Sequence, residues 1–352
     1  MNQKIRSCFS RWCPDRAAAL LAAGLLLGLA GCGPAGKGTD TIRVGVALYT
    51  QDDTFISTIQ QDMERLVRQR ENEQQLKINL STADGRSNQT TQLEQVDRFL
   101  SQGCDVLCVN IVDRTAAAVI VDKAQEAGVP LIFFNRQPVA EDIRRADNIY
   151  YVGAQAEEAG RLQGQLVLQA WQTQREQLDR NGDGVLQYVM LEGEPGHQDA
   201  LLRTEYSVKA LTSAGVEVEK LASDTANWNR AQGTAKTAQW NGQFGEQIEV
   251  VFSNNDDMAL GAIDAFQEAQ LELPLVVGVD ATAPALEAIR QGELYGTVLN
   301  DAEGIAEAMV DLALALTRGE DPAQTLQVED EHYIWLPCQQ ITLQDLEENQ
   351  NG

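Results

Sequence analysis

The sequence predicts an α/β protein built from two doubly wound parallel-sheet lobes. Short, almost continuously apolar segments alternate with longer amphipathic segments along most of the chain, a pattern typical of parallel strands that helices cover on both faces. About ten such apolar segments occur, which is too many for one lobe. The chain has 352 residues, 43% of them hydrophobic, whereas a single core stops growing near ~250–300 residues. Two lobes are therefore expected.

The first part of the chain repeats a strand–helix unit. Gly128 ends one of the predicted helices and Pro130 follows it directly, a common signal for a helix C-terminus. The strands expected here are Thr41–Leu48, Leu76–Leu80, Val106–Asn110 and Leu131–Phe134, and the helices run from about Phe55 to Arg70, Gln89 to Gln102 and Ala116 to Ala127.

The alternation then begins again, which we interpret as the second lobe. Its strands are expected at Tyr150–Val152, Leu186–Leu191, Glu217–Leu221, Glu249–Phe252, Leu275–Val279 and Gly296–Leu299, and a last helix at Ile305–Thr317. We assign residues 41–131 and 301–333 to the N-terminal lobe, and residues 132–300 and 334–352 to the C-terminal lobe.

Residues 1–31 are predicted to be a lipoprotein signal peptide. A positively charged start precedes an apolar run at residues 17–30, which is shorter than the ~20 residues of a bilayer-spanning helix. The run ends in Leu29-Ala30-Gly31-Cys32, which resembles the lipobox of bacterial lipoproteins. This resemblance implies cleavage before Cys32 and a lipid on that residue, with residues 32–40 as a flexible tether. An ordinary signal peptide with a chance cysteine is the alternative.

Charge and cysteine content narrow the class of partner and ligand. The formal net charge of −25 argues against nucleic acid and other polyanions as partners and suggests a neutral or cationic ligand. Cys104, Cys108 and Cys338 remain beyond the predicted signal and tether, and their spacing indicates neither a disulfide framework nor a zinc site. We expect them to be small buried side chains.

Polar side chains and two aromatic ones follow the predicted strands. In open α/β sheets, ligands bind beyond the carboxyl ends of the strands. Asp accepts hydrogen bonds, Arg donates them and Asn does both, which suits a ring of sugar hydroxyl groups, while flat aromatic rings can pack on the faces of a pyranose. For any single position, a helix N-cap or a turn is the alternative, and we accept it for Asp256.

These segments resemble the periplasmic galactose/glucose-binding proteins of sugar-transport and chemotaxis systems, which have the type I periplasmic binding-protein fold. The resemblance runs from Val44 to about Asn300. It rests on Asp52-Asp-Thr-Phe55, Asn110-Ile-Val-Asp113, Gly193-Glu-Pro-Gly-His197, Thr225-Ala-Asn-Trp228, Asn254-Asn-Asp256, Gly278-Val-Asp280 and Gly296-Thr-Val-Leu-Asn-Asp301.

The resemblance implies a hexose site with an aromatic ring on either face of the sugar. In the family, the position of Asp53 accepts from the C4 hydroxyl of either epimer, so D-galactose and D-glucose are both expected to bind. Gln198 stands where the family often has proline. The implied contacts are Asp53, Phe55, Asn110, His197, Asp199, Arg203, Trp228, Asn255, Asp280 and Asn300.

A calcium loop is also expected. Residues 179–187 begin like an EF-hand loop, with oxygen ligands at loop positions 1, 3 and 5, glycine at 6 and a backbone carbonyl at 7. Met190, at position 12, cannot close the site, and a plain turn is the alternative. The resemblance implies that Glu249 supplies the missing carboxylate of a structural Ca²⁺ site. The expected ligands are Asp179, Asn181, Asp183, Val185, Gln187 and Glu249.

The resemblance implies a monomeric binding protein whose lobes are joined by a hinge and close on a monosaccharide. The closed form would deliver it to the permease of an ABC transporter, and the lipid would be the only membrane contact. A sensor that presents its closed form to a chemoreceptor or sensor kinase is the alternative. A repressor would need a helix-turn-helix before the first strand, where a signal peptide is predicted. A glycosidase is disfavoured because Arg203, one helical turn from Asp199, would keep that carboxylate ionised.

Overall fold

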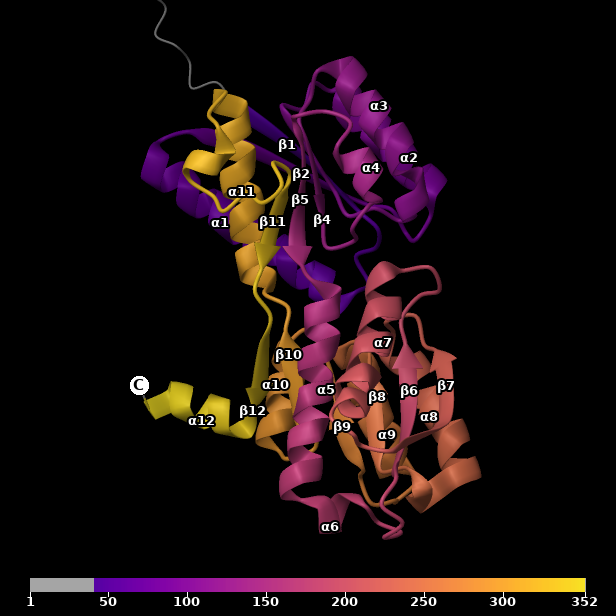
Figure 1. Ribbon diagram of the computed structural model, residues 1–352. Coiled ribbons are helices and arrows are strands. Elements are labelled where there is room, and N and C mark those ends of the chain that lie inside the picture. Colours follow the sequence, from indigo (N-terminus) through magenta and orange to yellow (C-terminus); the bar gives the residue numbers. More distant parts are fainter. Residues whose placement is uncertain (1–40, 352) are drawn as a thin grey trace, which may run out of the picture. The chain divides into compact units, whose positions relative to one another are not determined.

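The computed structural model of the protein describes residues 41–351. The predicted signal peptide, Cys32 and the tether lie outside these residues. The described chain forms two six-stranded sheets, with strand orders β11-β5-β4-β3-β1-β2 and β12-β10-β9-β8-β6-β7 (Figure 1). Helices cover both faces of each sheet. The predicted fold class of two doubly wound α/β lobes is therefore confirmed.

The first sheet is parallel throughout. Side chains alternate between its faces, so Val44, Val46 and Leu48 pack toward α1 and α11, whereas Ala47 packs toward α2 and α3. The strands are β1 (Thr41–Leu48), β2 (Lys77–Asp84), β3 (Val106–Val109), β4 (Leu131–Phe134), β5 (Ile149–Ala154) and β11 (Tyr333–Leu336), and the helices are α1 (Thr54–Gln74), α2 (Gln89–Ser101), α3 (Ala117–Ala127), α4 (Ala140–Ile143) and α11 (Ala302–Arg318), with short 3-10 turns η1 (Arg114–Ala116) and η3 (Pro322–Gln324).

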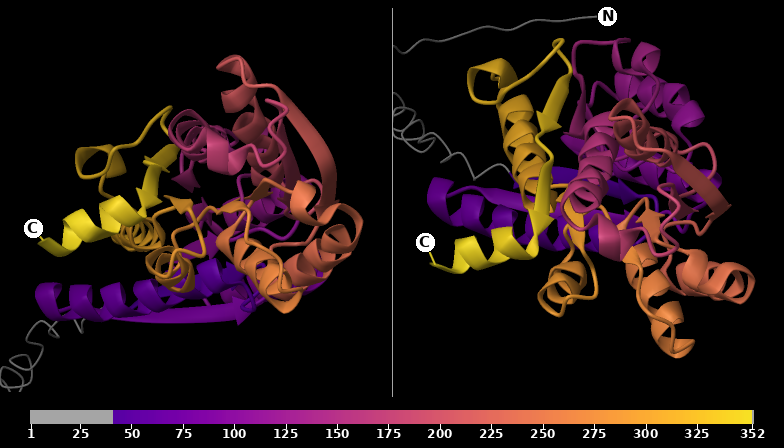
Figure 2. Two further views of the ribbon diagram at one scale, coloured as in Figure 1. Left: turned by 90° about the horizontal axis from the view of Figure 1, so that it is seen from below. Right: turned by 60° about the horizontal axis from the view of Figure 1, so that its bottom comes forward.

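The second sheet has one antiparallel edge strand, β12, which pairs with β10. Helices α5 and α7 lie on one face, and α8, α9 and α10 lie on the other. The strands are β6 (Leu186–Glu192), β7 (Val218–Thr225), β8 (Val250–Ser253), β9 (Leu275–Val277), β10 (Gly296–Leu299) and β12 (Gln339–Thr342), and the helices are α5 (Ala156–Thr173), α6 (Arg175–Leu178), α7 (Gln198–Ser213), α8 (Arg230–Phe244), α9 (Asp256–Glu268), α10 (Ala283–Arg290) and α12 (Leu343–Asn351), with a 3-10 turn η2 (Gly245–Gln247). Helix α12 projects from the end of β12 (Figure 2).

The lobe boundary predicted between residues 131 and 132 is misplaced. β4 pairs with β3, and β5 pairs with both β4 and β11, so all four strands belong to the first sheet. The first lobe comprises residues 41–154 and 302–336, and the second lobe comprises residues 156–300 and 339–351. Apolar periodicity identifies a buried strand but not the sheet that it joins, because that choice depends on distant backbone hydrogen bonds.

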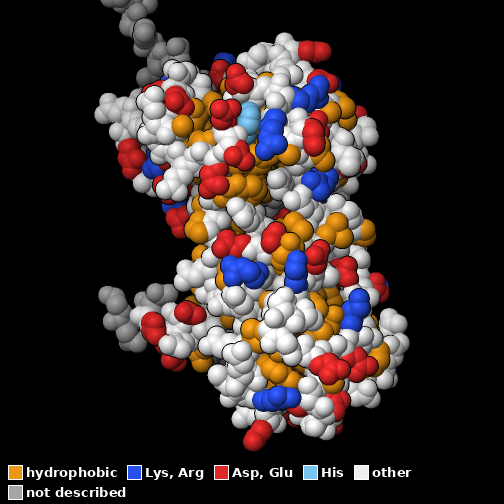
Figure 3. All heavy atoms as spheres, viewed as in Figure 1, with side chains coloured by type: hydrophobic (Ala, Val, Ile, Leu, Met, Phe, Trp, Pro, Cys, Tyr) orange, Lys and Arg blue, Asp and Glu red, His pale blue; other side chains and the backbone are white. Residues whose placement is uncertain are grey.

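The cysteines, the helices and the surface charge of the described residues can be compared with the predictions from the sequence. All three cysteines are free; Cys104 and Cys108 are buried, as predicted, whereas Cys338 is only partly buried. In residues 41–351, no helix combines the length and apolar composition needed to cross a membrane. On the face shown in Figure 3, Lys and Arg side chains lie scattered among Asp and Glu side chains, so this face presents no extended basic surface to a phosphate backbone.

Candidate functional site

The carboxyl ends of strands from both lobes meet at one small cavity, called the slot from here on. Its volume is about 30 Å³, roughly the share of one water molecule in the liquid and far below the ~300–1,000 Å³ of typical ligand pockets. Most of the side chains that line it are buried, so the lobes are closed on each other and a ligand can enter only when they part. The slot is lined by Tyr49, Asp53, Phe55, Asn135, Arg136, His197, Asp199, Arg203, Trp228, Asn255 and Asp280.

The first lobe contributes a wall at the start of α1. Asp53 is the N-cap of this helix, and its Oδ1 accepts a hydrogen bond of 3.0 Å from the amide of Ile56. The Tyr49 hydroxyl donates to the other oxygen, Oδ2, at 2.5 Å. Phe55 is buried in the first turn of α1 and lines the slot. The cap thus fixes the carboxylate of Asp53 and the ring of Phe55 on one rigid element.

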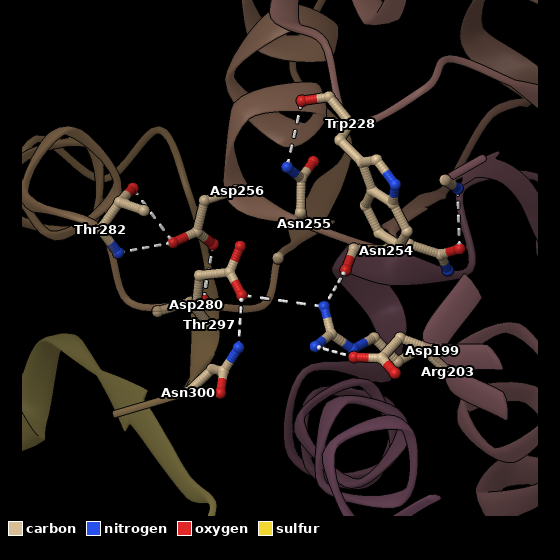
Figure 4. Close-up of polar contacts among 12 residues, drawn as sticks. Asp199, Arg203, Trp228, Asn254, Asn255, Asp256, Asp280, Thr282, Thr297 and Asn300 are labelled. Carbon is tan, nitrogen blue, oxygen red and sulfur yellow. Dashed lines mark hydrogen bonds and ion pairs between the residues drawn. The ribbon is translucent and has the colours of Figure 1, made fainter. Parts of the chain in front are cut away.

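The second lobe contributes a buried charge cluster centred on Arg203 (Figure 4). Its Nη2 donates to Asp199 Oδ2 at 2.9 Å, and its Nη1 donates to the carbonyl of Asn254 at 2.9 Å and lies 3.7 Å from Asp280 Oδ1. Burial lowers the pKa of Arg203, but the carboxylates outweigh it and raise that pKa overall. The guanidinium stays charged and balances buried carboxylates that would otherwise be costly.

Burial also shifts the two carboxyl groups beside Arg203. It raises the pKa of Asp199, so burial outweighs the opposing effect of the guanidinium that was expected to keep this carboxylate ionised. It raises the pKa of Asp280 well above its usual range, again against Arg203 and with the negative charge of Asp256 adding to the effect. Asn300 donates to Asp280 Oδ1 at 3.2 Å. Burial therefore reduces the tendency of both carboxyl groups to carry a negative charge beside Arg203.

Trp228 and His197 form a second aromatic wall. The His197 ring meets the indole of Trp228 edge-on, with ring centroids 5.0 Å apart. His197 Nδ1 accepts from the amide of Asp199 at 3.1 Å, and burial followed by the charges of Arg136 and Arg203 lowers the pKa of His197 well below its usual range. A neutral ring that accepts at Nδ1 carries its hydrogen on Nε2, so His197 is a donor there.

The backbone around Trp228 is held in an uncommon conformation. Trp228 has φ 62° and Asn227 has φ 51°, in the left-handed region that residues with a side chain rarely adopt. Asn255 donates to the Trp228 carbonyl at 3.2 Å and also caps α9. Gly193 has no side chain where a Cβ would lie 2.1 Å from the indole. The indole position is thus specified by the surrounding backbone.

Several buried polar atoms at this site make no hydrogen bond within the protein. They are the Nε of Arg203, the Nε1 of Trp228, the Oδ1 of Asn300 and the Nη2 of Arg136, whose contact with Glu194 Oε2 at 2.9 Å is an ion pair without hydrogen-bond geometry. Buried polar groups in native proteins nearly always make hydrogen bonds, and an unmade one costs about 1–3 kcal/mol. Donors and an acceptor are therefore available here for a ligand with several hydroxyl groups.

The structure brings the predicted sugar contacts together, with two exceptions. All of them line the slot except Asn110 and Asn300. Asn300 lies behind Asp280. Asn110 is fully buried, and its amide group is used within the first lobe, donating to the Phe134 carbonyl at 3.0 Å and to Asn135 Oδ1 at 3.1 Å while accepting from the Tyr49 amide at 3.4 Å. In this conformation Asn110 supports the wall instead of lining it.

Sequence reasoning missed Tyr49, Asn135 and Arg136. Each follows a strand of the first sheet, so the strand-end rule applied to them as well. Asn135 and Arg136 come directly after β4, and the lobe boundary predicted between residues 131 and 132 assigned both of them to the other lobe. Tyr49 is the first residue after β1 and continues an apolar run, which hid the role of its hydroxyl group.

The N-cap interpretation of Asp256 is off by one residue. Asn255 caps α9, and Asp256 points into the second lobe (Figure 4). Asp256 Oδ1 accepts from the Thr297 hydroxyl at 2.6 Å, and Oδ2 accepts from the amide and hydroxyl of Thr282 at 2.8 and 3.2 Å. Burial raises the pKa of Asp256 to about 7. Its role is therefore to join β10 and the start of α10 to α9.

The predicted calcium ligands come together in the loop between α6 and β6 and in Glu249. Asp179 Oδ2 accepts from the Gly184 amide at 3.1 Å, while its Oδ1 is buried and has no partner. Glu249 accepts from the amides of Arg180 and Gln187 at 2.7 and 2.9 Å. Burial, together with the charges of Asp179 and Asp183, raises the pKa of Glu249.

The arrangement of this loop only partly fits a metal ion. The side-chain nitrogens of Asn181 and Gln187 donate to Asp183 Oδ2 at 2.9 and 3.0 Å, so both amide groups would have to turn to offer oxygen to a cation. In the part of the chain that the structure describes, no three Asp, Glu, His or Cys side chains are grouped as metal ligands. The unpartnered Asp179 oxygen is the feature that fits a cation.

Comparisons with known proteins agree on one family. Residues 44–321 match the model of the periplasmic binding protein domain. The chain is 39% identical over 283 residues to the D-galactose/methyl-galactoside binding periplasmic protein MglB of Haemophilus influenzae, covering 80% of this chain and 83% of that protein. It is 30% identical over 304 residues to a xylitol-binding protein of Mycolicibacterium smegmatis, covering 86% and 80%.

Solved structures agree with this result. An ABC transporter solute binding protein from Bacillus halodurans with bound myo-inositol superimposes with a TM-score of 0.72 at 29% identity, covering 90% of this chain and 99% of that one. A periplasmic solute binding protein of an ABC transporter from Actinobacillus succinogenes with bound D-allose gives a TM-score of 0.74 at 20% identity, covering 87% of this chain and 99% of that one. At this identity, the comparison shows a likeness of fold.

Proposed function

The chain belongs to the periplasmic binding protein domain family, and from this premise we propose that it binds D-galactose or D-glucose between its lobes and delivers the sugar to a membrane ABC transporter. The family consists of binding proteins, so the chain is a binding protein and not an enzyme. Its site of action is extracytoplasmic, as in the family.

The observation that carries this proposal is the composition of the slot. Two aromatic side chains, Phe55 and Trp228, line it together with carboxylates, a guanidinium and a neutral histidine. Buried donors and acceptors without partners are present beside them. A hexose offers hydroxyl groups that can both donate and accept around its edge, with C–H groups on its faces for the aromatic rings.

The choice of hexose over other polyols is supported by the relative named for D-galactose, which is the most similar in sequence of the relatives reported above. Other similar proteins are named for xylitol or were solved with myo-inositol. All of these ligands are small, uncharged and rich in hydroxyl groups, and the discriminating experiment must include them.

Calorimetry on the mature protein tests the proposal. We expect D-galactose and D-glucose to bind at least tenfold more tightly than ribose, arabinose, xylitol and myo-inositol. The Trp228→Ala variant should lose hexose binding, whereas the matched Trp335→Ala variant removes an equal side chain from the first sheet and should retain it. Tighter binding of a pentose or of either polyol, or near-normal affinity in Trp228→Ala, would overturn the assignment.

We also propose that residues 179–187 and Glu249 hold one structural Ca²⁺ ion, supported by the buried, unpartnered Asp179 Oδ1. Metal that binds only the folded state must stabilise it. A chelator should therefore lower the melting temperature of the wild type, and Asp179→Asn should abolish that effect. An equal melting temperature with and without chelator removes calcium from the proposal.

Two further expectations concern the membrane and signalling. We propose that Cys32, which lies outside the described residues, carries a lipid; Cys32→Ala should release the protein from the membrane fraction, and continued membrane association would contradict this. The alternative role as a sensor for a chemoreceptor or sensor kinase stays a prediction.

A further inference from the structure

Side chains of the two lobes contact each other on both sides of the slot. On one side, the Thr54 hydroxyl of the first lobe donates to Asp257 Oδ2 of the second at 2.7 Å. On the other side, Gln198 donates to Gln137 Oε1 at 3.0 Å. Beside that pair, Arg136 Nη2 of the first lobe lies 2.9 Å from Glu194 Oε2 of the second. These contacts exist only while the lobes are closed.

Arg136 differs from the other bridging residues because it is buried and faces the ligand site. It is 5% exposed, and it lines both the slot and a neighbouring cavity of about 490 Å³. Its Nη1 donates to the carbonyl of Val112 at 3.2 Å. Together with His197, which also lines both spaces, the guanidinium forms the partition between the slot and the larger cavity.

A chain of contacts runs from this bridge to a predicted sugar contact. The guanidinium carbon of Arg136 lies 3.5 Å from the ring centroid of Tyr49, a close cation–π contact. The Tyr49 hydroxyl donates to Asp53 Oδ2 at 2.5 Å, and the other oxygen of Asp53 caps α1. These contacts connect Glu194 of the second lobe to Asp53 through Arg136 and Tyr49.

The backbone supports this arrangement. Asn135 has φ 57°, in the left-handed region, and the amide of Arg136 donates back to the Phe134 carbonyl at 2.7 Å. This tight turn after β4 directs Arg136 across the mouth of the slot. Such a conformation is uncommon for a residue with a side chain, and it persists only where surrounding contacts impose it.

We propose that Arg136 is a positioning residue that couples lobe closure to the ligand site. Pairing of Arg136 with Glu194 seals the slot from the adjoining cavity and fixes Tyr49 and Asp53 for the sugar, so the pair governs how long the ligand is retained. This inference rests on the proposed hexose-binding function. Opening of the lobes separates Arg136 from Glu194, so ligand escape requires the pair to break.

Stopped-flow measurements with D-galactose test the role of Arg136. Glu194 is partly exposed, with 29% of its side chain accessible, so solvent weakens the pair, and Glu194→Gln should raise the dissociation rate about fivefold and leave the association rate nearly unchanged. Arg136→Met should raise it at least tenfold, because the contact with Tyr49 is lost too. Arg136→Lys should restore part of the difference. In the double variant Arg136→Met with Glu194→Gln, the effects should not add.

The control is Glu303→Gln, which removes a comparable ion pair, with Arg65, at 2.6 Å on the exposed surface of the first lobe. It should release the sugar at the wild-type rate. Wild-type release by Glu194→Gln, or additive effects in the double variant, would refute the positioning role while leaving hexose binding intact. Absence of hexose binding in the wild type would instead refute the proposed function.

Discussion

Replacing Gly193 by alanine is the most direct test of how the aromatic wall of the slot is built. Gly193 follows β6, and Trp228 follows the neighbouring strand β7. A Cβ at residue 193 would lie 2.1 Å from Cζ2 and 2.2 Å from Cη2 of the indole. Carbon atoms prefer separations of about 3.5–4.0 Å, so the ring must move by roughly 1.5 Å. The indole is rigid, and its backbone is already in the left-handed region.

The expected cost follows from this displacement. Overpacking a buried site typically destabilises a protein by about 1–3 kcal/mol, and Trp228 is 8% exposed within the core cluster of the second lobe. A shift of 1.5 Å also takes the ring out of contact with a sugar face. Because each ~1.4 kcal/mol is a factor of ten, we expect hexose affinity to fall at least tenfold.

Gly242→Ala is a control that adds the same methyl group. Gly242 is an exposed residue of α8 whose added Cβ would meet nothing within 4 Å, so alanine there should stabilise the helix by about 0.5–1 kcal/mol. Urea unfolding and calorimetry with D-galactose report both quantities. Wild-type stability and affinity in Gly193→Ala would show that the glycine does not set the position of the indole.

Two further predictions concern the packing behind the slot. Asp256→Asn should change how stability depends on pH. Burial raises the pKa of Asp256 to about 7 from ~3.9 when unfolded, so its stabilising contribution is full below about pH 4 and is lost as the pH rises through 7. The free energy of unfolding of the variant, measured in urea, should therefore rise relative to that of the wild type by up to about 4 kcal/mol between pH 4.5 and 7.5. A difference in unfolding free energy that stays constant over this pH range would contradict the assignment. Gly164→Ala should push α5 away from α7, because its Cβ would lie 2.1 Å from the Ser207 carbonyl. We expect a loss of about 1–3 kcal/mol together with weaker hexose binding, since α7 carries Asp199 and Arg203; unchanged affinity would show that α7 is held by other contacts.

The repeated strands and helices were predictable because each carries its own periodicity. β1 was placed at Thr41–Leu48, and the structure has the same bounds. The two strands near the C-terminus were missed. β11 is a short segment that ends just before Pro337, and β12 contains two glutamines at an exposed edge. Neither has the apolar run of a central strand, and only pairing with distant strands makes them part of a sheet.

The slot was largely predictable because the carboxyl ends of parallel strands converge whatever the rest of the sequence does. Which contacts each of these side chains makes was less predictable. Asn110 and Asn255 both follow a strand, yet Asn110 is consumed by backbone groups of its own lobe, whereas Asn255 lines the slot. That difference depends on which carbonyl and amide groups lie opposite, and these come from parts of the chain far away in sequence.

The charge balance of the slot explains how so acidic a chain can hold an uncharged ligand. Asp199 and Asp280 face Arg203 within the second lobe, and burial shifts the pKa of both carboxyl groups upward. Arg136 pairs with Glu194, and the low pKa of His197 leaves that ring neutral. An ionised ligand would add an uncompensated charge to a closed site, at a cost of several kcal/mol. A neutral ligand adds none, and its hydroxyl groups can use the donors and acceptor that the protein leaves unpaired.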